Sequence, residues 1–465
     1  MIIKEIKNLI PLDCFVNLRN DNYPFLLESS TDHSKLGRYS FAGSNPFLIF
    51  SSYNDEITVT KRDGVKKTFT GNPFLELQKL LDKYARRKDS LPFCSGAVGY
   101  FAYEMGHHIE ALPKRAKEDI ALPHSFFGFY DTVFIHDHHL NKSFAAYDDS
   151  IFSTSKESTE KIIDAFIDKI SGAAKYITKS NFADHDLRLE SNFDRASYNK
   201  GIKKVLAYIS KGDIYQANLS QRFSVDFTGD AVSFYKGFVK VSPAPFGALI
   251  DIKDAVIMSN SPERYLKKAG DYIETRPIKG TRATSVDADE DRRLMEELQK
   301  SEKDLAEHLM IVDLERNDLG RVSKYGSVKV EEFAVLESYS NVHHLVSTVT
   351  GRLRDGVIPI ECIMNSFPGG SITGAPKIRA MEIIDEIEPT TRSIYTGAIG
   401  YFDFSGDFDF NIAIRTAIYY NGKIYFQVGG GIVADSEPDM EYEETIVKAK
   451  NFLKAVELYS KENGK

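Results

Sequence analysis

Short strands joined by tight turns constrain the fold of this 465-residue chain more than any other feature of its sequence. In the segment 417–424, two strand-forming runs flank Asn421-Gly422, a dipeptide typical of two-residue hairpin turns. Similar runs, rich in aromatic and β-branched residues and bounded by Gly, Pro, Asn or Asp, predict strands in both halves of the chain. The predicted strands cover 24–28, 38–42, 47–51, 57–61, 96–103, 132–136, 216–225, 255–258, 327–334, 398–404, 412–420 and 424–428.

Periodic apolar residues predict helices in separate stretches of the chain. These predicted helices cover 161–170, 198–210, 291–319, 376–387 and 440–459. Hairpin-like runs of strands with segregated helices indicate an α+β fold with mostly antiparallel sheets, and they argue against a doubly wound parallel sheet.

The length of the chain suggests two or three domains. The polar segment 171–192 lacks periodicity, and we interpret it as a linker between an N-terminal lobe, residues 1–175, and a second region, residues 190–460. The two regions share an echo, because Ser-Gly-Ala-Val-Gly-Tyr-Phe at 95–101 nearly matches Thr-Gly-Ala-Ile-Gly-Tyr-Phe at 396–402. The echo fits either a shared strand pattern or two related half-sheets packed on each other. We expect the two lobes to form one intertwined unit.

Composition excludes several classes of function. The net charge of −8 and pI near 5.8 disfavour a nucleic-acid surface, which needs a basic face. No apolar run approaches the roughly 18 residues that span a membrane, and charges interrupt the N-terminus too often for a signal peptide. Cys14, Cys94 and Cys362 are too scattered for a disulfide framework and read as buried hydrophobes. We therefore expect a cytoplasmic enzyme.

The segment 276–282, Arg-Pro-Ile-Lys-Gly-Thr-Arg, carries the strongest indication of chemistry. Two fixed cations, Arg276 and Arg282, disfavour a third charge on Lys279 between them, and Gly280 removes side-chain bulk beside it. A lysine that loses its proton easily is a recognised source of a nucleophilic amine. The alternative is a basic loop that is simply solvated.

Two acid pairs predict a possible metal site. Glu441 and Glu444 share one face of the last predicted helix, which follows the glycine run 429–431, and Asp304 and Glu307 repeat the spacing upstream. Carboxylates from two helices suit Mg²⁺, which prefers a few such oxygens together with waters and substrate oxygens. The alternative is a pair of solvated, salt-bridged helix faces.

A glycine-rich segment at 367–377, Phe-Pro-Gly-Gly-Ser-Ile-Thr-Gly-Ala-Pro-Lys, precedes a predicted helix. Its glycines and its proline near the helix start predict an N-terminus that receives an anion. It lacks the Gly-Lys-Ser/Thr ending of a Walker loop. A tight turn onto a capped helix explains it equally well.

Together these blocks resemble the chorismate-utilising enzymes over essentially the whole chain, most strongly from residue 213 to 450. The resemblance includes Leu-Leu-Glu-Ser at 26–29 and Gly-Arg-Tyr-Ser at 37–40. It implies two layered, mostly antiparallel β-sheets packed on each other with helices outside, as in anthranilate synthase component I. It also implies that residues 190–460 form the catalytic region.

Two positions narrow the expected reaction within this family, Lys279 toward the aminodeoxychorismate synthases and Gln216 toward ammonia as the incoming nucleophile. Pro-Ile-Lys-Gly-Thr at 277–281 is typical of aminodeoxychorismate synthases, whereas anthranilate synthases typically have alanine in place of Lys279. Isochorismate and salicylate synthases carry a lysine base for water at the position of Gln216, and glutamine cannot act as that base.

The resemblance also assigns roles to residues. Mg²⁺ held by Glu307 and Glu444, with Asp304 and Glu441 acting through waters, binds the ring carboxylate of chorismate. Glu263 protonates the departing C4 hydroxyl while Lys279 attacks C2, and ammonia at C4 then displaces the lysine. Further matches at the site are Thr281 and His344 as catalytic neighbours, and Gly280, Tyr395, Arg415, Gly431, Lys448 and Gln216 as substrate-binding residues.

A second ligand site is implied in the N-terminal lobe. It resembles the tryptophan pocket of the family and comprises Glu28, Ser29, Arg38, Pro243, Pro245 and Phe246. Ser242 stands where the family usually has asparagine, so the sequence leaves the occupancy of this pocket open.

The expected activity is that of aminodeoxychorismate synthase component I, which transfers an amide nitrogen to chorismate for para-aminobenzoate and folate synthesis. None of the three cysteines lies in a nucleophile-elbow context, and the placed motifs leave no length for a glutaminase domain. We therefore expect ammonia to come from glutamine through a separate amidotransferase subunit. The alternatives are anthranilate synthase component I and a non-catalytic regulator that binds tryptophan or chorismate.

Overall fold

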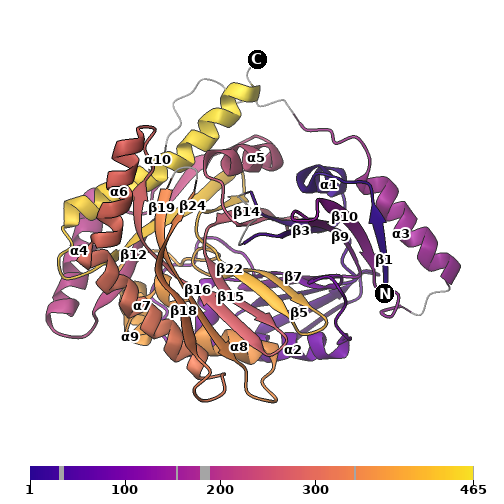
Figure 1. Ribbon diagram of the computed structural model, residues 1–465, viewed down its shortest axis with the longest axis horizontal. Helices are drawn as coiled ribbons and strands as arrows, with labels where there is room; N and C mark the ends of the chain where they lie inside the picture. The colour runs from indigo at the N-terminus through magenta and orange to yellow at the C-terminus, as the bar shows by residue number, and fades with distance from the viewer. Residues whose placement is uncertain (31–35, 153–155, 178–188, 340–341, 464–465) are drawn as a thin grey trace.

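Two sheets packed face to face form the centre of the molecule, with helices on both outer surfaces (Figure 1). The computed structural model describes residues 1–30, 36–152, 156–177, 189–339 and 342–463. Each sheet has 12 strands, and the paired strands run antiparallel. The predicted α+β class with two layered antiparallel sheets is confirmed. Among the described residues, no helix combines the length and apolar character needed to cross a membrane.

The strands are named here in their spatial order. Sheet A contains β1 (Ile2–Ile6), β10 (Lys142–Tyr147), β9 (Thr132–Asp137), β3 (Tyr39–Gly43), β2 (Phe25–Glu28), β13 (Phe246–Asp251), β14 (Ala255–Ser261), β23 (Thr416–Tyr420), β24 (Lys423–Ile432), β12 (Gln216–Asp226) and β11 (Glu190–Ser191), with β20 (Gly374–Ala375) beside β12. Sheet B contains β17 (Ile278–Ala283), β19 (Val342–Arg352), β16 (Tyr272–Arg276), β15 (Arg264–Ala269), β22 (Phe408–Ile412), β21 (Ala398–Asp403), β7 (Gly96–Phe101), β8 (Ser125–Tyr130), β4 (Leu48–Tyr53), β5 (Glu56–Lys61) and β6 (Lys66–Thr70), with β18 (Lys329–Ser338) beside β19.

The helices cover the two outer faces. On the sheet A side lie α1 (Pro11–Leu18), α3 (Lys156–Ile170), α5 (Ala231–Val241) and α10 (Pro438–Asn463), while α4 (Arg195–Ser210) and α9 (Lys377–Ile387) pack around β12. On the sheet B side lie α2 (Pro73–Lys83), α6 (Ala288–Lys300), α7 (Glu302–Gly320) and α8 (Pro359–Ser366). Two short 3₁₀ turns, η1 (Tyr103–His108) and η2 (Gly370–Ile372), complete the elements.

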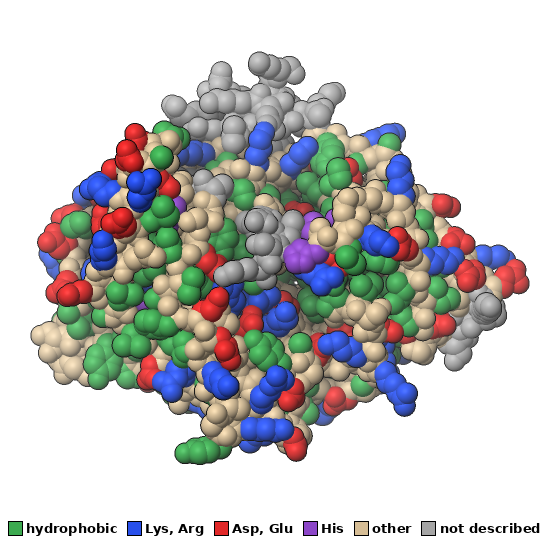
Figure 2. Space-filling model, in the orientation of Figure 1, with side chains coloured by type: hydrophobic (Ala, Val, Ile, Leu, Met, Phe, Trp, Pro, Cys, Tyr) green, Lys and Arg blue, Asp and Glu red, His purple; other side chains and the backbone are tan. Residues whose placement is uncertain are grey.

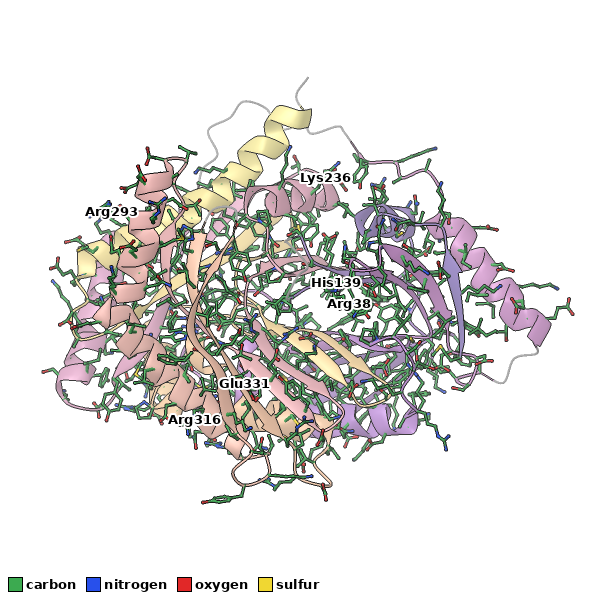
Figure 3. All side chains as sticks on the ribbon, viewed as in Figure 1. Arg38, His139, Lys236, Arg293, Arg316 and Glu331 are labelled. Atoms are coloured by element: carbon green, nitrogen blue, oxygen red, sulfur yellow. The ribbon has the colours of Figure 1, made fainter. Side chains whose placement is uncertain are left out.

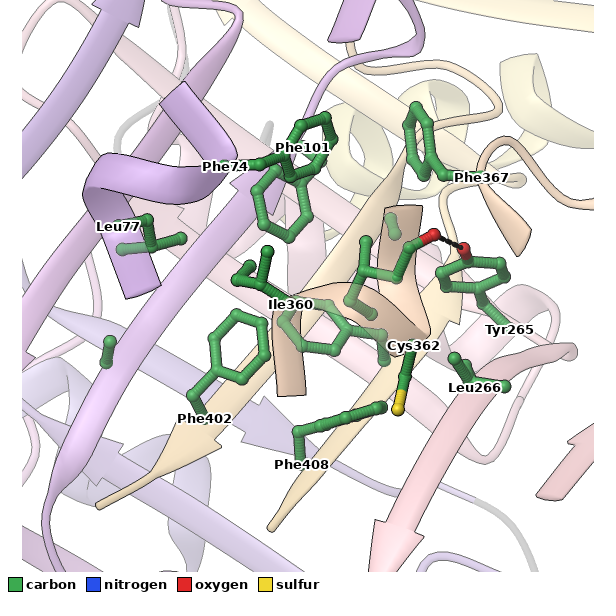
Figure 4. Packing of buried hydrophobic residues seen from close by; sticks show 14 of the residues in the cluster. Phe74, Leu77, Phe101, Tyr265, Leu266, Ile360, Cys362, Phe367, Phe402 and Phe408 are labelled. Carbon is green, nitrogen blue, oxygen red and sulfur yellow. Dashed lines mark hydrogen bonds between the residues drawn. The ribbon is translucent and has the colours of Figure 1, made fainter. Parts of the chain in front are cut away.

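Apolar side chains form separate cores between these layers. One core lies between the sheets, where Phe41 of sheet A packs edge-on against Tyr401 of sheet B with ring centroids 5.4 Å apart. Another lies between sheet B and its helices, where Phe74 of α2 packs on Phe101 (Figure 4). In the same core the Tyr265 hydroxyl donates to the carbonyl oxygen of Ile363 at 3.2 Å, so even its polar group is bonded.

The chain contains two copies of one supersecondary pattern. The first copy is β1, α1, β2, β3, β4, β5, β6, α2, β7, β8, β9, β10 and α3, and the second is β12, α5, β13, β14, β15, β16, β19, α8, β21, β22, β23, β24 and α10. Sheet A runs β1-β10-β9-β3-β2 and then β13-β14-β23-β24-β12. Each strand of the first copy therefore lies as far from the middle of the sheet as the equivalent strand of the second copy. Sheet B shows the same arrangement, β6-β5-β4-β8-β7 and then β21-β22-β15-β16-β19. Strands from both copies are therefore paired within each sheet.

The echo in the sequence lies at the centre of this pseudo-twofold arrangement. Its two segments form β7 and β21, which pair with Gly99 opposite Gly400. These two residues hold equivalent places in the echo, so the pseudo-twofold axis passes between them. The related segments are neighbours in one sheet, which the sequence alone did not decide.

One of the differences between the two copies is an insertion that follows β16. In the first, β5 and β6 are joined by residues 62–65, whereas in the second β17, α6, α7 and β18 separate β16 from β19. Lys279 lies in this insertion, on β17. The second copy thus owes its extra sheet edge and the helices that cover this edge to this insertion.

In the second copy, two of the crossings between the sheets are neighbours in space. β14 leads from sheet A to β15 of sheet B through Ser261 and Glu263, and β22 leads from sheet B to β23 of sheet A. The crossings are joined, because the Ser261 hydroxyl donates to the Ile412 carbonyl oxygen at 2.6 Å and the Ile412 N–H to the Glu263 carbonyl oxygen at 3.0 Å. The predicted single strand 412–420 was wrong, since residues 413–415 make this crossing.

Two other boundary predictions were wrong for local reasons. The predicted helix 291–319 is broken at Ser301, whose side chain caps α7 by accepting from the Asp304 N–H. The predicted strand 96–103 ends at Phe101, because the chain turns into η1. The sequence also left unpredicted the elements β1, β6, β8, β10, β11, β13, β15, β16, β17, β19, β20, β22, α1, α2, α5 and α8.

We expect Gly99→Ala to destabilise the protein by at least about 3 kcal/mol, because a Cβ there would lie 1.7 Å from the Phe126 carbonyl oxygen in the neighbouring strand. Gly237→Ala in α5 is the matched control. A Cβ at that position meets only the Ala455 oxygen at 3.6 Å, so the substitution should be neutral or stabilising by about 0.5–1 kcal/mol. Urea unfolding of both variants measures the difference, and equal stabilities would contradict the close approach at the axis.

Candidate active site

The candidate site lies where Lys279 of β17 approaches the glycine run of β24. A Cβ placed on Gly431 would lie 3.5 Å from Lys279 Nζ and 2.0 Å from Gln216 Nε2. A Cβ on Gly430 would lie 3.3 Å from Glu441 Oε2 and 3.7 Å from a carboxylate oxygen of Glu444. The glycines therefore let side chains from β12, β17 and α10 close in on one stretch of backbone. Lys448 donates to the Gly429 carbonyl oxygen at 2.8 Å.

The pKa of Lys279 is lowered, chiefly by burial. Lys448 lowers it further, while Glu307, Glu263 and Glu444 oppose the shift. The direction agrees with the expectation from the sequence, but the flanking arginines are not the main reason. Both are held in ion pairs, Arg276 with Glu337 at 2.7 Å and Arg282 with Asp304 at 3.1 Å. Partial burial of Lys279 on β17 thus shifts its protonation equilibrium toward the neutral amine.

Glu263 is a buried acid next to the lysine. It lies on the crossing between β14 and β15 and accepts from the Ile278 N–H at 3.3 Å. Burial raises its pKa to about 7, against the opposing influence of the Ser371 hydroxyl, the Ile278 N–H and Lys279. At neutral pH a large share of the Glu263 carboxyl groups therefore carry a proton that they can donate.

A chain of polar contacts links Thr281, His344 and Arg415. Thr281 Oγ1 lies 2.9 Å from His344 Nδ1, and Arg415 Nη2 lies 3.5 Å from His344 Nε2. Because arginine only donates, Nε2 is the acceptor and Nδ1 carries the hydrogen directed at Thr281. Burial and Arg415 lower the pKa of His344 to about 3, so the imidazole is neutral.

Arg415 is held in an unfavourable backbone conformation at the crossing between the sheets. Its φ of 47° is uncommon for a residue with a side chain, and its backbone oxygen accepts from the Asn260 N–H at 2.9 Å. Nη1 donates to the Ser242 hydroxyl at 3.0 Å. Burial lowers the Arg415 pKa to about 10, which still leaves the guanidinium charged and able to bind a carboxylate.

The predicted magnesium ligands approach one another from α7 and α10. Burial is the main reason that the pKa values of Glu307 and Glu441 are raised. Neighbouring acids raise them further: Asp304 and Glu441 act on Glu307, and Glu444 acts on Glu441. A cation would relieve this repulsion, and the donors are the carboxylate oxygens that Mg²⁺ prefers. In the structure, however, Arg282 pairs with Asp304 and Lys448 with Glu444 at 2.7 Å.

No three His, Cys, Asp or Glu side chains are grouped as a ready metal site within the described parts of the chain. The acids thus fit Mg²⁺ in chemical type but are not arranged around a common point. The magnesium site stays a prediction.

The remaining predicted substrate residues lie around the same backbone. Gly280 has a φ of 75° and lies against α6 and α7, where a Cβ would be 3.3 Å from Asp304 Cβ. Tyr395 is 7% exposed and its ring lies 5.8 Å from the Arg392 guanidinium. Arg392 in turn donates to the carbonyl oxygen of Asn218, which pairs with Gly431 across β12 and β24.

The sequence analysis missed a buried acid group behind the glycine-rich turn. Glu315 Oε1 accepts from the Gly370 N–H at 2.9 Å, and Lys377 Nζ binds Asp318 at 2.5 Å. The group that accepts from this turn is therefore a carboxyl oxygen of the protein's own Glu315. Both acids lie on the buried face of α7 with His308 and Ile311. These residues recur every three or four positions, and this helical spacing was the signal in the sequence that could have identified the two acids as buried.

A separate cavity of about 520 Å³ lies between the sheets near the pseudo-twofold axis. It brings together four of the predicted tryptophan-site residues, Glu28, Arg38, Pro245 and Phe246, while Ser29 and Pro243 are not in its lining. Arg38 lies beside His139 in Figure 3, and Lys and Arg side chains gather in the hollow at the centre of this face in Figure 2. Whether tryptophan binds there stays a prediction.

Comparisons with known proteins agree with this geometry. Residues 23–454 match a family described as chorismate binding enzyme. The chain is 42% identical to aminodeoxychorismate synthase component 1 of Klebsiella aerogenes over 447 residues, covering 95% of this chain and 96% of the relative. It is 37% identical to anthranilate synthase component 1 of Acetivibrio thermocellus over 460 residues, covering 96% of this chain and 92% of the relative.

The solved structure of anthranilate synthase component I from Streptococcus pneumoniae superposes with a TM-score of 0.81 at 32% identity, covering 90% of this chain and 92% of that chain. The isochorismate synthase MenF of Escherichia coli, at 15% identity and a TM-score of 0.74 over 98% of this chain and 94% of that one, shares the fold. On the sequence match and the shared fold, the chain belongs to the chorismate binding enzymes.

Proposed function

We propose that this enzyme is an aminodeoxychorismate synthase component I, which converts chorismate and ammonia into 4-amino-4-deoxychorismate. The observation that carries the proposal is Lys279, whose amine is made less basic by burial next to the acid Glu263. A neutral amine and a protonated carboxyl group are the two states that the reaction needs in its first step.

The two groups act on opposite ends of one displacement. Lys279 Nζ attacks C2 of chorismate, and the Glu263 carboxyl proton passes to the C4 hydroxyl as it leaves as water. Ammonia then forms a bond at C4, and the bond between C2 and Lys279 breaks. The lysine thereby divides one difficult substitution into two easier ones.

The remaining residues bind and orient the substrate. Arg415, fixed by Ser242, binds the enolpyruvyl carboxylate together with Tyr395, and the neutral His344 holds Thr281 in place. Glu307 and Glu444, assisted by Asp304 and Glu441, would hold Mg²⁺. When bound, this ion supplies positive charge for the ring carboxylate of chorismate.

Anthranilate synthase component I is the second candidate, because both kinds of relative match the chain at similar identity. Lys279 favours the first candidate, since an enzyme that aminates C2 gains nothing from a lysine that occupies C2. The non-catalytic alternative leaves unexplained why the acids, Lys279 and Glu263 share one site.

The burial of the three cysteines bears on the source of ammonia. Cys14, Cys94 and Cys362 are buried, and burial raises the pKa of each thiol, to about 12 for Cys94 and Cys362. Such thiols are unsuited to attack glutamine. We propose that a separate glutamine amidotransferase subunit supplies ammonia.

Lys279→Ala should lower turnover by at least about 100-fold while leaving the free energy of unfolding nearly unchanged, because the variant loses a reacting group. The unmutated enzyme should show a covalent substrate adduct on Lys279 by intact-protein and peptide mass spectrometry. Lys66→Ala, an exposed lysine on β6 at the far edge of the same sheet, is the control and should keep full activity. Full activity of Lys279→Ala would exclude the lysine as nucleophile.

The pH dependence of kcat/KM should report the protonation state of Glu263. At saturating ammonium, kcat/KM for chorismate should fall as pH rises above about 7, because the carboxyl group loses the proton that it must donate. Glu263→Gln should reduce activity by about 10²–10⁴-fold and remove this descending limb from the residual rate. An unchanged limb in the variant would assign it to another group.

Product analysis decides between the two candidate reactions. With chorismate, Mg²⁺ and ammonium, the purified chain should form a product that retains the enolpyruvyl group, and a chelator should abolish its formation. Glutamine should replace ammonium only when an amidotransferase subunit is added. Released pyruvate with a fluorescent product would identify an anthranilate synthase instead.

A further inference from the structure

A small cavity of about 90 Å³ lies behind the candidate active site, between η1 and the carboxyl end of α9. Its rim includes the exposed Lys114 and Glu118, and its buried wall includes Glu104, Glu388 and Arg392. Neither the resemblance to the family nor the proposed mechanism gives this cavity a role.

Three η1 residues that line this cavity each have a buried polar atom without a hydrogen-bond partner among the described residues. These atoms are the Tyr103 hydroxyl, Glu104 Oε2 and His107 Nδ1. Glu104 is 7% exposed, and its other oxygen accepts from the Arg392 N–H at 2.9 Å and the Ser393 N–H at 3.2 Å. Because buried polar groups are nearly always bonded, three orphan atoms at one cavity indicate a ligand that bonds to them.

The charges around the cavity select a cation. Apart from the Arg392–Glu388 pair, the lining has the acids Glu104, Glu118 and Asp385 against the single cation Lys114. Burial raises the pKa of Glu104 to about 7, and a bound cation would favour its ionised form. Arg392 is already committed to Glu388 through hydrogen bonds of 2.7 and 2.9 Å. Burial lowers the pKa of His107 to about 4, so its imidazole is neutral and Nδ1 can accept a hydrogen bond. His124 adds no free charge, because it is paired with Glu118 at 2.8 Å.

The polar atoms of Glu104, Tyr103 and His107 favour a cation that donates hydrogen bonds. Mg²⁺ and Ca²⁺ bind sets of oxygen ligands, whereas this cavity offers a carboxylate oxygen, a phenol oxygen and an imidazole nitrogen. No grouping of three metal-binding side chains occurs there within the described residues. The small volume excludes a bulky organic cation. We propose that the cavity binds an ammonium ion, which donates to Glu104, Tyr103 and His107.

If the proposed function holds, ammonium bound in this cavity would lie near the chorismate site. Arg392 forms the wall between the cavity and the chorismate site, because it donates to Asn218 O at 2.6 Å and to Thr396 Oγ1 at 3.3 Å. Its guanidinium lies 4.8 Å from the centroid of the Tyr103 ring and 5.8 Å from that of the Tyr395 ring. Ammonium held at Glu104 would therefore raise the local concentration of the nitrogen source one side chain away from its point of use.

The binding test uses the whole protein without chorismate or Mg²⁺, so it does not depend on the identity of the reaction. The free energy of unfolding is measured in urea with increasing ammonium chloride, and with sodium chloride and tetramethylammonium chloride at equal ionic strength. Ammonium alone should add stability that grows with its concentration, as expected for a ligand of the native state. Tyr103→Phe and Glu104→Gln should lose this increment.

Tyr100→Phe is the matched control, because the Tyr100 hydroxyl donates to the Pro123 carbonyl oxygen rather than to the cavity. Tyr100→Phe should keep the ammonium increment. Equal effects of sodium and ammonium on the unmutated protein would overturn the proposal and indicate that the three atoms bind water only. An increment retained in both cavity variants would also overturn it.

A kinetic measurement tests whether the site serves turnover. Tyr103→Phe should raise the KM for ammonium about tenfold, the effect expected from losing one hydrogen bond to a charged group, whichever aminated product is formed. Tyr100→Phe should leave that KM unchanged. Ammonium binding without a change in KM would overturn the role in supply, and an anthranilate product would overturn the proposed function while leaving the binding result intact.

Discussion

Burial between and beside two facing sheets is the constraint on which the chemistry of this protein depends. Removing a group from water disfavours its charged form, so burial lowers the pKa of Lys279 and raises the pKa of Glu263 to about 7. One physical cause thus favours the neutral form of an amine and of a carboxyl group at the same site. It also keeps His344 neutral, although Arg415 beside it stays charged because an unperturbed guanidinium is so strongly basic.

The duplicated architecture explains why the site lies in only one half of the molecule. Both copies contribute equivalent strands to both sheets, and they meet where Gly99 faces Gly400. Only the second copy carries β17, α6, α7 and β18 between the strands that the first copy joins by residues 62–65. These added elements bring Lys279, Asp304 and Glu307 to the edge of sheet B, opposite the glycine run and the acids of α10.

Buried ion pairs organise the regions behind the site. Arg392 and Glu388 are 1% and 2% exposed, and the arginine also donates to backbone oxygens from β12 and η2. A buried pair offsets its desolvation only when its remaining hydrogen-bonding capacity is satisfied, which these carbonyl groups achieve. Glu315 is satisfied in a similar way by the N–H of Gly370. The glycine-rich turn is thereby held by the protein's own acid.

The sequence by itself determined the α+β class and the positions of about half of the strands, and it predicted the reacting residues, because alternating hydrophobicity and ordered motifs are local properties of the chain. It could not place Ser301 as a break between α6 and α7, or residues 413–415 as a crossing between sheets, because a side-chain cap and a change of sheet leave the apolar pattern nearly intact. It also misjudged the cause of the Lys279 shift. Charge spacing pointed to Arg276 and Arg282, but ion pairs with distant acids hold both arginines. Burial and long-range pairing arise only when the sheets close on each other, so the tertiary structure alone decided the electrostatics of the site.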